Sequence, residues 1–220
     1  MLNGSVGNFK NILLKSLHEK VIRRALIAGF LKPFHSEERP LQSLKGFCVF
    51  NQFNMVSIFK SAKSTAPERN LSIEAFFDGV KNGQWQDQIL PYRANPTKEG
   101  KVLISAVTAS GTFRERNVKG IVTHSGLICI DVDSKDQIAD FDIEQIKSDI
   151  YTYCIHRSVS GYGYAVYVKI DPTRHLDAFL GLEEYYFNNF SIVIDKACKD
   201  IPRLRFVSYD PDLVINEKAK

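Results

Sequence analysis

The sequence predicts an α+β fold whose elements follow the order β-α-β-β-α-β, the ferredoxin-like or split βαβ arrangement. Three observations predict it: runs of β-forming residues bounded by turn residues, helical repeats between these runs, and a glycine-rich link between two of them. The runs typical of strands are residues 127–133, 151–160, 164–170, 191–195 and 203–208. Gly161 and Gly163 join the second run to the third, as in a β-hairpin.

Two helices are expected between these strands. Residues 141–150 and 175–190 both repeat apolar side chains at helical spacing. Asp142 is placed to cap the first of these helices, with Gln145 three residues later. In the split βαβ sheet the first strand is central and pairs antiparallel with the last. We therefore expect residues 127–133 to pair with the strand Leu204–Ser208.

A small α/β lobe is expected before this unit. Residues 71–85 have the pattern of a helix that ends at Gly83, and residues 101–113 read as a strand that runs into a turn at Gly111. With 220 residues, 44% of them hydrophobic, the chain can bury one full core and a small second lobe.

Cysteine usage indicates a reducing compartment, and we expect a cytoplasmic protein. None of the four cysteines has C-x-x-C spacing, so neither a disulfide framework nor a zinc site is expected. They are instead predicted to be free thiols, buried at least where they lie in strand-like runs. The four are Cys48, Cys129, Cys154 and Cys198.

The first fifty residues differ from the rest in charge. Residues 1–50 contain eight Lys or Arg and three Glu, a charge of +5, so residues 51–220 carry +4 − 5 = −1. We therefore expect a basic, partly helical extension at 1–50 and one domain at 51–220. Residues 11–31 have the pattern of a basic amphipathic helix, which could contact DNA or a membrane surface, pack on the domain, or form a poorly ordered leader. The apolar run at 25–31 is far too short to cross a bilayer, and no membrane partner is expected.

Three aspartates are candidate metal ligands. Asp131 and Asp133 follow a buried strand and point to the same side, because side chains alternate across a strand. In the expected sheet, Asp195 lies just before the last strand and can approach them. Carboxylate oxygens suit Mg²⁺ or Mn²⁺, and three carboxylates could hold two such ions for phosphoryl transfer. The alternative is that all three are ordinary residues of strand ends and turns.

The hairpin is a candidate phosphate-binding segment. Small residues there let the backbone approach a ligand, and exposed N–H groups can hold phosphate oxygens. Nearby arginines could supply the positive charge that a triphosphate requires. The residues concerned are Ser158, Ser160, Gly161, Gly163, Arg157, Arg203 and Arg205. Glycines are also the ordinary solution for a hairpin turn, and Arg205 could instead pair with Asp210 or Asp212.

Four stretches together resemble the VirE N-terminal domain family, a primase-like domain of bacterial mobile elements and phages grouped with the archaeo-eukaryotic primases. They are "ISAVTASGTF", "GLICIDVDSKD", "HRSVSGYGYAVYVKI" and "IDKACKDIPRLRFVSYDPDLVIN". The resemblance implies an RRM-like palm with a small N-terminal lobe. It also implies metal ligation by Asp131, Asp133 and Asp195, and nucleotidyl transfer from nucleoside triphosphates on DNA or RNA, as in a DNA-directed primase or polymerase of DNA replication.

The chain departs from that family at one position. After S-G-x-G-x the resemblance implies a histidine or lysine on the nucleotide's phosphates, where this chain has Ala165. Two alternatives therefore stay open. One is a catalytically inactive module that binds nucleic acid or nucleotide and works with a helicase, in trans or on a longer chain. The other is a metal-dependent nuclease, for which His156 is the nearest candidate base.

Overall fold

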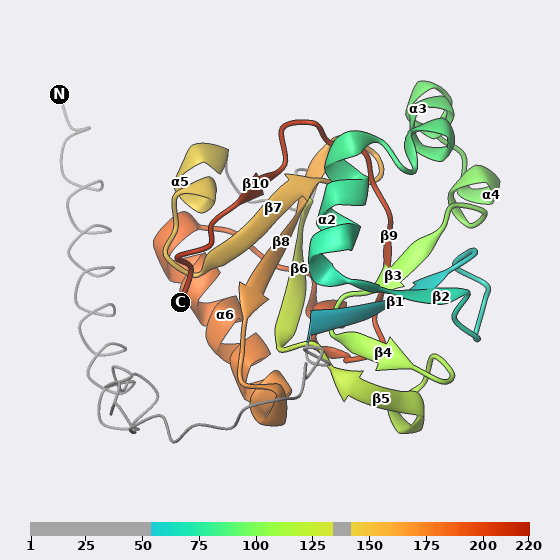
Figure 1. Ribbon diagram of the computed structural model, residues 1–220. Helices are drawn as coiled ribbons and strands as arrows, with labels where there is room; N and C mark the ends of the chain where they lie inside the picture. The colour runs from blue at the N-terminus through green and yellow to red at the C-terminus, as the bar shows by residue number, and fades with distance from the viewer. Residues whose placement is uncertain (1–53, 134–141) are drawn as a thin grey trace, which may run out of the picture. The chain divides into compact units, whose positions relative to one another are not determined.

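The computed structural model describes residues 54–133 and 142–220 (Figure 1). Its first sheet has the strand order β2-β1-β3-β9, and every pair in it is antiparallel. These strands are β1 (Met55–Phe59), β2 (Arg69–Ser72), β3 (Ala106–Thr108) and β9 (Leu204–Phe206). A separate two-stranded ladder joins β4 (Gly111–Phe113) to β5 (Ile121–His124).

The second sheet carries the predicted aspartate strand. Its order is β10-β7-β8-β6, and all of its pairs are antiparallel. The strands are β6 (Leu127–Asp133), β7 (Thr152–Arg157), β8 (Gly163–Lys169) and β10 (Val214–Ile215). Asp131 lies opposite Ala165 and Asp133 lies opposite Gly163, so both aspartates lie at the end of β6 that adjoins the hairpin between β7 and β8.

Two of the helices are bounded by a residue that the sequence marks, Gly83 at the end of one and Asp142 at the start of another. Helix α2 (Ile73–Asn82) is capped by the Ser72 hydroxyl and ends at Gly83, whose φ of 85° suits glycine. Helix α5 (Ile143–Lys147) is capped by Asp142, which accepts a hydrogen bond from the Glu144 N–H. The other helices are α3 (Gln86–Ala94), α4 (Lys98–Lys101) and α6 (His175–Phe190), with 3₁₀ turns η2 (Val118–Gly120), η4 (Pro172–Arg174) and η5 (Lys196–Lys199).

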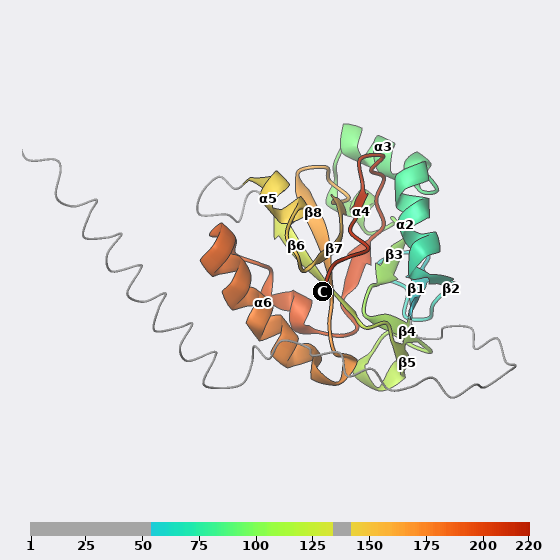
Figure 2. The ribbon, with the colours of Figure 1, turned by 60° about the vertical axis from the view of Figure 1, so that its left-hand side comes forward.

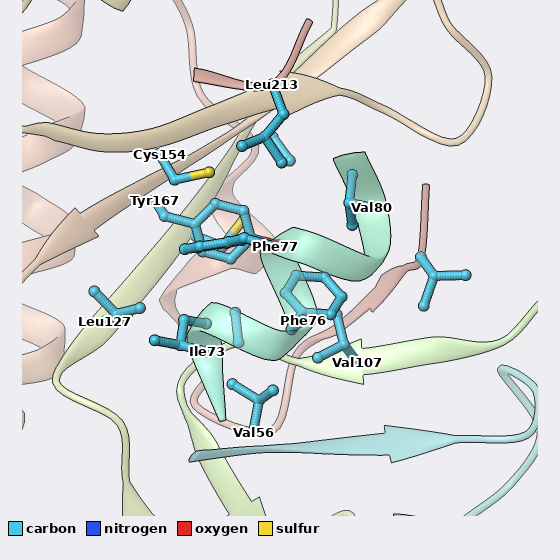
Figure 3. Packing of buried hydrophobic residues seen from close by; sticks show 14 of the residues in the cluster. Val56, Ile73, Phe76, Phe77, Val80, Val107, Leu127, Cys154, Tyr167 and Leu213 are labelled. Carbon is cyan, nitrogen blue, oxygen red and sulfur yellow. The ribbon is translucent and has the colours of Figure 1, made fainter. Parts of the chain in front are cut away.

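Two apolar clusters lie on the two faces of the second sheet. On one face α2 packs between the two sheets, and the Phe77 and Tyr167 rings meet edge to face at 4.9 Å (Figure 3). On the other face α5 and α6 cover the alternate residues of the same strands (Figure 2). The odd-numbered positions of β6, which include both aspartates, therefore face α2 and the first sheet.

The α+β class is confirmed, but the expected course of the last strand is wrong. Leu204–Phe206 pairs with β3 of the first sheet and not with β6 (Figure 1). Residues 191–195 form no strand, and residues 101–113 divide between α4, β3 and β4. Gly111 lies at the start of β4, opposite His124, rather than in a turn. The predictions for residues 1–50, including Cys48 and the basic helix, lie outside the described residues.

Candidate metal and phosphate site

The structure brings together two of the three predicted carboxylates. Ligand atoms of Asp131, Asp195 and Cys198 all lie within 4.8 Å of one another. Asp131 comes from the end of β6, whereas Asp195 caps η5 and accepts a hydrogen bond from the Ala197 N–H. Cys198 is buried in the same 3₁₀ turn. Residues 64 positions apart, 195 minus 131, thus meet although the last strand pairs elsewhere.

Asp133 does not belong to that group, as far as the described residues go. Its carboxylate lies instead against β8: a Cβ atom added to Gly163 would stand 2.6 Å from Asp133 Oδ1 and 2.8 Å from the Val132 carbonyl oxygen. Only glycine leaves this space open. Gly163 therefore lets the Asp133 carboxylate lie close to the neighbouring strand.

Arg205 is a buried counter-ion of the site. Its Nη1 contacts Asp131 Oδ2, and its Nη2 donates to the Cys129 carbonyl oxygen at 2.6 Å and to the Cys198 sulfur. Its side chain is 5% exposed and that of Asp131 is 27% exposed. Burial lowers the pKa of Arg205, but a guanidinium keeps its charge at physiological pH. The suggested pairing of Arg205 with Asp210 or Asp212 is wrong, because the guanidinium pairs with Asp131 instead.

Arg203 pairs with the second carboxylate, but at the surface. Its Nη2 lies 2.8 Å from Asp195 Oδ2, and the two side chains are 40% and 41% exposed. Exposed ion pairs contribute about 0–1 kcal/mol, so this contact is easily exchanged for another. Of the two arginines next to the cluster, Arg203 is therefore the one that can turn toward a phosphate.

The ligand chemistry fits a hard cation. Two carboxylates supply oxygen ligands of the kind that Mg²⁺ and Mn²⁺ prefer. Burial raises the pKa of the Cys198 thiol well above its ordinary value, so the sulfur stays protonated and is a poor ligand. The Cys129 thiol, buried beside Arg205, has a raised pKa for the same reason. Asp131 and Asp195 are thus the residues that could hold a divalent cation.

Several N–H groups of the hairpin already have partners within the loop. The N–H groups of Ser158 and Gly161 donate to carbonyl oxygens of the loop itself, and that of Gly163 donates to the Ser158 hydroxyl. The Ser158 and Ser160 hydroxyls lie 3.2 Å apart. Gly161 has a φ of 82° and makes the turn possible. The loop is thus largely satisfied by its own contacts.

Arg93, which the sequence did not single out, holds this loop. Its guanidinium donates to the carbonyl oxygens of Ser158 and Val159, at 2.9 and 3.2 Å, and to the Ser208 hydroxyl at 3.1 Å. Arg93 comes from α3, 66 positions before Val159, so no local pattern could have indicated the contact. It connects the helices that precede β3 to the hairpin beside the aspartates.

Arg157 is the last residue of β7, which β8 separates from β6 and therefore from Asp131. Its N–H donates to Asp210 Oδ2 at 2.6 Å, and its guanidinium stands about 4 Å from Asp210 and Asp212. These residues, with Lys147 and Tyr164, line a pocket of about 240 Å³. Two cations and two carboxylates balance there, so the pocket has no excess positive charge for a phosphate.

His156, the candidate base of a nuclease, is buried at 2% exposure. It lies opposite Ala165, which in turn lies opposite Asp131, so one row across β7, β8 and β6 holds all three residues. The small Ala165 side chain separates the imidazole from the carboxylate by a full strand. His156 Nδ1 is 2.8 Å from the Arg157 carbonyl oxygen, and burial lowers the histidine's pKa. These contacts are those of a structural histidine.

No helix among residues 54–133 and 142–220 is both long and apolar enough to cross a membrane. Comparison with known proteins adds one match. The family model for the BT4734-like N-terminal domain matches residues 99–214, which include β3, the strands β6, β7 and β8 of the second sheet, both aspartate segments and Arg205. No curated protein and no solved structure matches the chain.

This match corrects the family expected from the motifs. The matching family is the BT4734-like N-terminal domain and not the VirE N-terminal domain, and no primase family matches. The primase and DNA-replication assignment that depended on the resemblance is therefore wrong. The matched stretch covers 116 of 220 residues, counted as 214 − 99 + 1. The chain therefore belongs to the family defined by the BT4734-like N-terminal domain.

Proposed function

We propose that the chain is a phosphoryl-transfer domain that binds Mg²⁺ or Mn²⁺ through Asp131 and Asp195 and acts on a nucleoside triphosphate. One observation carries this proposal: two carboxylates from distant segments converge within 4.8 Å beside two arginines. Carboxylates this close repel each other, and a divalent cation would stabilise the pair once Arg203 has left Asp195. The proposed reaction class is nucleotidyl transfer, with DNA or RNA as the second substrate.

In this reaction a hydroxyl oxygen of the acceptor forms a bond to the α-phosphorus, the bond to the bridging oxygen of pyrophosphate breaks, and the hydroxyl proton passes to solvent. A divalent cation, when bound, stabilises the negative charge that develops on the phosphate oxygens. Asp131 and Asp195 would hold the cation. Arg203 would leave its exposed contact with Asp195 and pair with the phosphates.

The fold supports this placement. Strands β6, β8 and β7 lie side by side in the order of the first, third and second strands of a split βαβ unit, with α5 and α6 on one face. We propose that they form a palm-like sheet that presents Asp131 and Asp133 at its end. In a split βαβ unit the fourth strand pairs with the first. Among the described residues no strand pairs with the outer edge of β6, and the Arg205 side chain donates a hydrogen bond to the Cys129 carbonyl oxygen of that edge instead.

A second candidate is a non-catalytic module that binds nucleotide or nucleic acid, with a helicase as its proposed partner. The observation that favours it is the pairing of Arg205 with Asp131, because this buried contact already neutralises one carboxylate. Ala165 adds to it, since an alanine opposite Asp131 can neither donate a hydrogen bond nor carry charge.

Release of pyrophosphate tests the two candidates. The reaction would contain the chain, MnCl₂, four deoxynucleoside triphosphates and a primed DNA template, with an RNA template in parallel. Asp195→Asn should lower the rate by at least about a hundredfold, because the ion loses one of its two ligands. Asp177→Asn, an exposed change on α6, is the control and should leave the rate unchanged. Equal rates for wild type and Asp195→Asn would refute the catalytic proposal. Manganese-dependent nucleotide binding without release would favour the binding module.

A further inference from the structure

The cluster of Asp131, Asp195 and Cys198 contains a buried positive charge, the guanidinium of Arg205, that is held in place. The guanidinium of Arg205 is 95% buried, since 5% is exposed, and it contacts Asp131, the Cys129 carbonyl oxygen and the Cys198 sulfur at once. Its backbone belongs to β9 in the first sheet, while two of its three contacts lie in β6 of the second. Turning the side chain out would leave a buried carbonyl oxygen and a carboxylate without their donor.

Arg203 provides the contrast within the same segment. It is two residues away, also pairs with an aspartate of the group, and is 40% exposed. Water can replace its contacts at little cost, whereas the contacts of a buried ion cannot be replaced. A metal ion that approaches the group can therefore displace Arg203 but meets Arg205 as a fixed neighbour.

We propose that the site takes one divalent cation rather than two, because Arg205 supplies the charge and occupies the carboxylate oxygen that a second ion would need. This inference rests on the function proposed above. The ions of a two-ion site lie about 3.5–4 Å apart, and a carboxylate can bridge them only when each of its two oxygens is open to a different ion. Here Oδ2 of Asp131 is already bound to the guanidinium, which leaves one oxygen for metal.

The charges also favour a single ion. Asp131 and Asp195 supply −2 and Arg205 supplies +1, which leaves −1 when Arg203 has turned away. One divalent cation brings this cluster to +1, whereas a second would raise it to +3 in a partly buried site. Arg205 does not touch substrate in this scheme. It is a positioning residue that fixes the ion count and aims the remaining oxygen of Asp131.

Manganese stoichiometry tests the inference independently of activity. Binding of MnCl₂ to the full chain would be followed by electron paramagnetic resonance, which counts free ions and separates single from exchange-coupled ions. Three variants would accompany the wild type. Arg205→Lys keeps the charge, Arg205→Gln removes it, and Arg203→Gln removes the exposed charge as the matched control.

The expected result is one uncoupled ion per chain in the wild type, in Arg205→Lys and in Arg203→Gln. Arg205→Gln should bind its first ion roughly tenfold more tightly and acquire a second, coupled ion. Two coupled ions in the wild type would overturn the one-ion inference while leaving the proposed function intact. No bound ion in the wild type would overturn the proposed function itself. The wild-type count decides both points even where a variant does not fold.

Discussion

Arg205 of β9 and Asp131 of β6 form an ion pair that connects the first sheet to the second. Neither strand pairs with the other, so this side-chain contact fastens the β9 segment to the free edge of β6. The neighbouring Arg203–Asp195 pair has the same chemistry at the surface. The two pairs therefore allow the effect of burial to be measured within one short segment.

Removing the buried charge should be costly. We expect Arg205→Met to lower the free energy of unfolding by about 3–5 kcal/mol, because it leaves Asp131 and the Cys129 carbonyl oxygen without their donor. Arg203→Met should cost no more than about 1 kcal/mol, because its pair is exposed. Urea unfolding of both variants measures the difference. Equal losses would show that Arg205 is not held as described.

Gly163 should not tolerate a side chain. Alanine there would place its Cβ 2.6 Å from Asp133 Oδ1 and 2.8 Å from a backbone oxygen, and we expect a loss of about 1–3 kcal/mol together with weaker manganese binding. Gly181 is the control, because a Cβ added on this exposed helical position meets nothing within 4 Å. Gly181→Ala should stabilise the chain by about 0.5–1 kcal/mol. Thermal unfolding and a manganese titration measure both effects. Unchanged stability in Gly163→Ala would contradict the close approach of Asp133.

Arg93 should control the order of the hairpin. Arg93→Ala removes the donor to the Ser158 and Val159 carbonyl oxygens, and charge-assisted bonds of this kind contribute about 1.5–3 kcal/mol. We expect faster hydrogen exchange in residues 158–163 of this variant, followed by mass spectrometry of that peptide. Arg69→Ala, an exposed change in β2 on the far side of the first sheet, is the control. Exchange that is equally slow in Arg93→Ala and wild type would show that the loop holds its shape without Arg93.

Stability should fall in acid because of a histidine pair. His124 Nε2 and His175 Nδ1 lie 3.0 Å apart, and burial, followed by the neighbouring histidine, lowers the pKa of His124 to about 4. The unfolded chain binds a proton near pH 6.5 and the folded chain only near pH 4, so the free energy of unfolding decreases as the pH falls through this window. One pKa unit corresponds to about 1.4 kcal/mol, and because His124 is partly exposed to solvent we expect it to contribute a smaller loss than the full shift would give, on the order of 2 kcal/mol. Urea unfolding at pH 7.5, 5.5 and 4.5 measures it, and His124→Gln should flatten the dependence. A flat profile in the wild type would refute this role of the pair.

Local patterns predicted the parts of the site that lie on single elements. The apolar run before Asp131 and Asp133 is the strand β6, Asp142 caps α5, and α2 ends at Gly83. The approach of Asp195 to Asp131 was also expected, but from a strand pairing that does not occur. The 3₁₀ turn η5 and the Arg205 side chain bring the two together instead.

Contacts between distant segments could not be predicted from these patterns. Arg205 looked like a phosphate ligand because it is a cation near a glycine turn, and only the packing of β9 against β3 turns it inward. The strand pattern pointed the other way: Leu204 and Phe206 are apolar, so alternation predicts that they face inward and that Arg205 is exposed, whereas the structure buries Arg205. Arg93 gave no signal either, because its partners lie more than 60 positions away.

The most direct test of the account is a double-mutant cycle for manganese affinity, measured by calorimetry on wild type, Asp131→Asn, Asp195→Asn and the double variant. If both carboxylates hold the same ion, each single change should weaken binding at least about tenfold, and the double variant should be little worse than either one. Asp177→Asn should bind like the wild type. Full affinity in Asp195→Asn, or losses that simply add, would contradict a shared ion at Asp131 and Asp195.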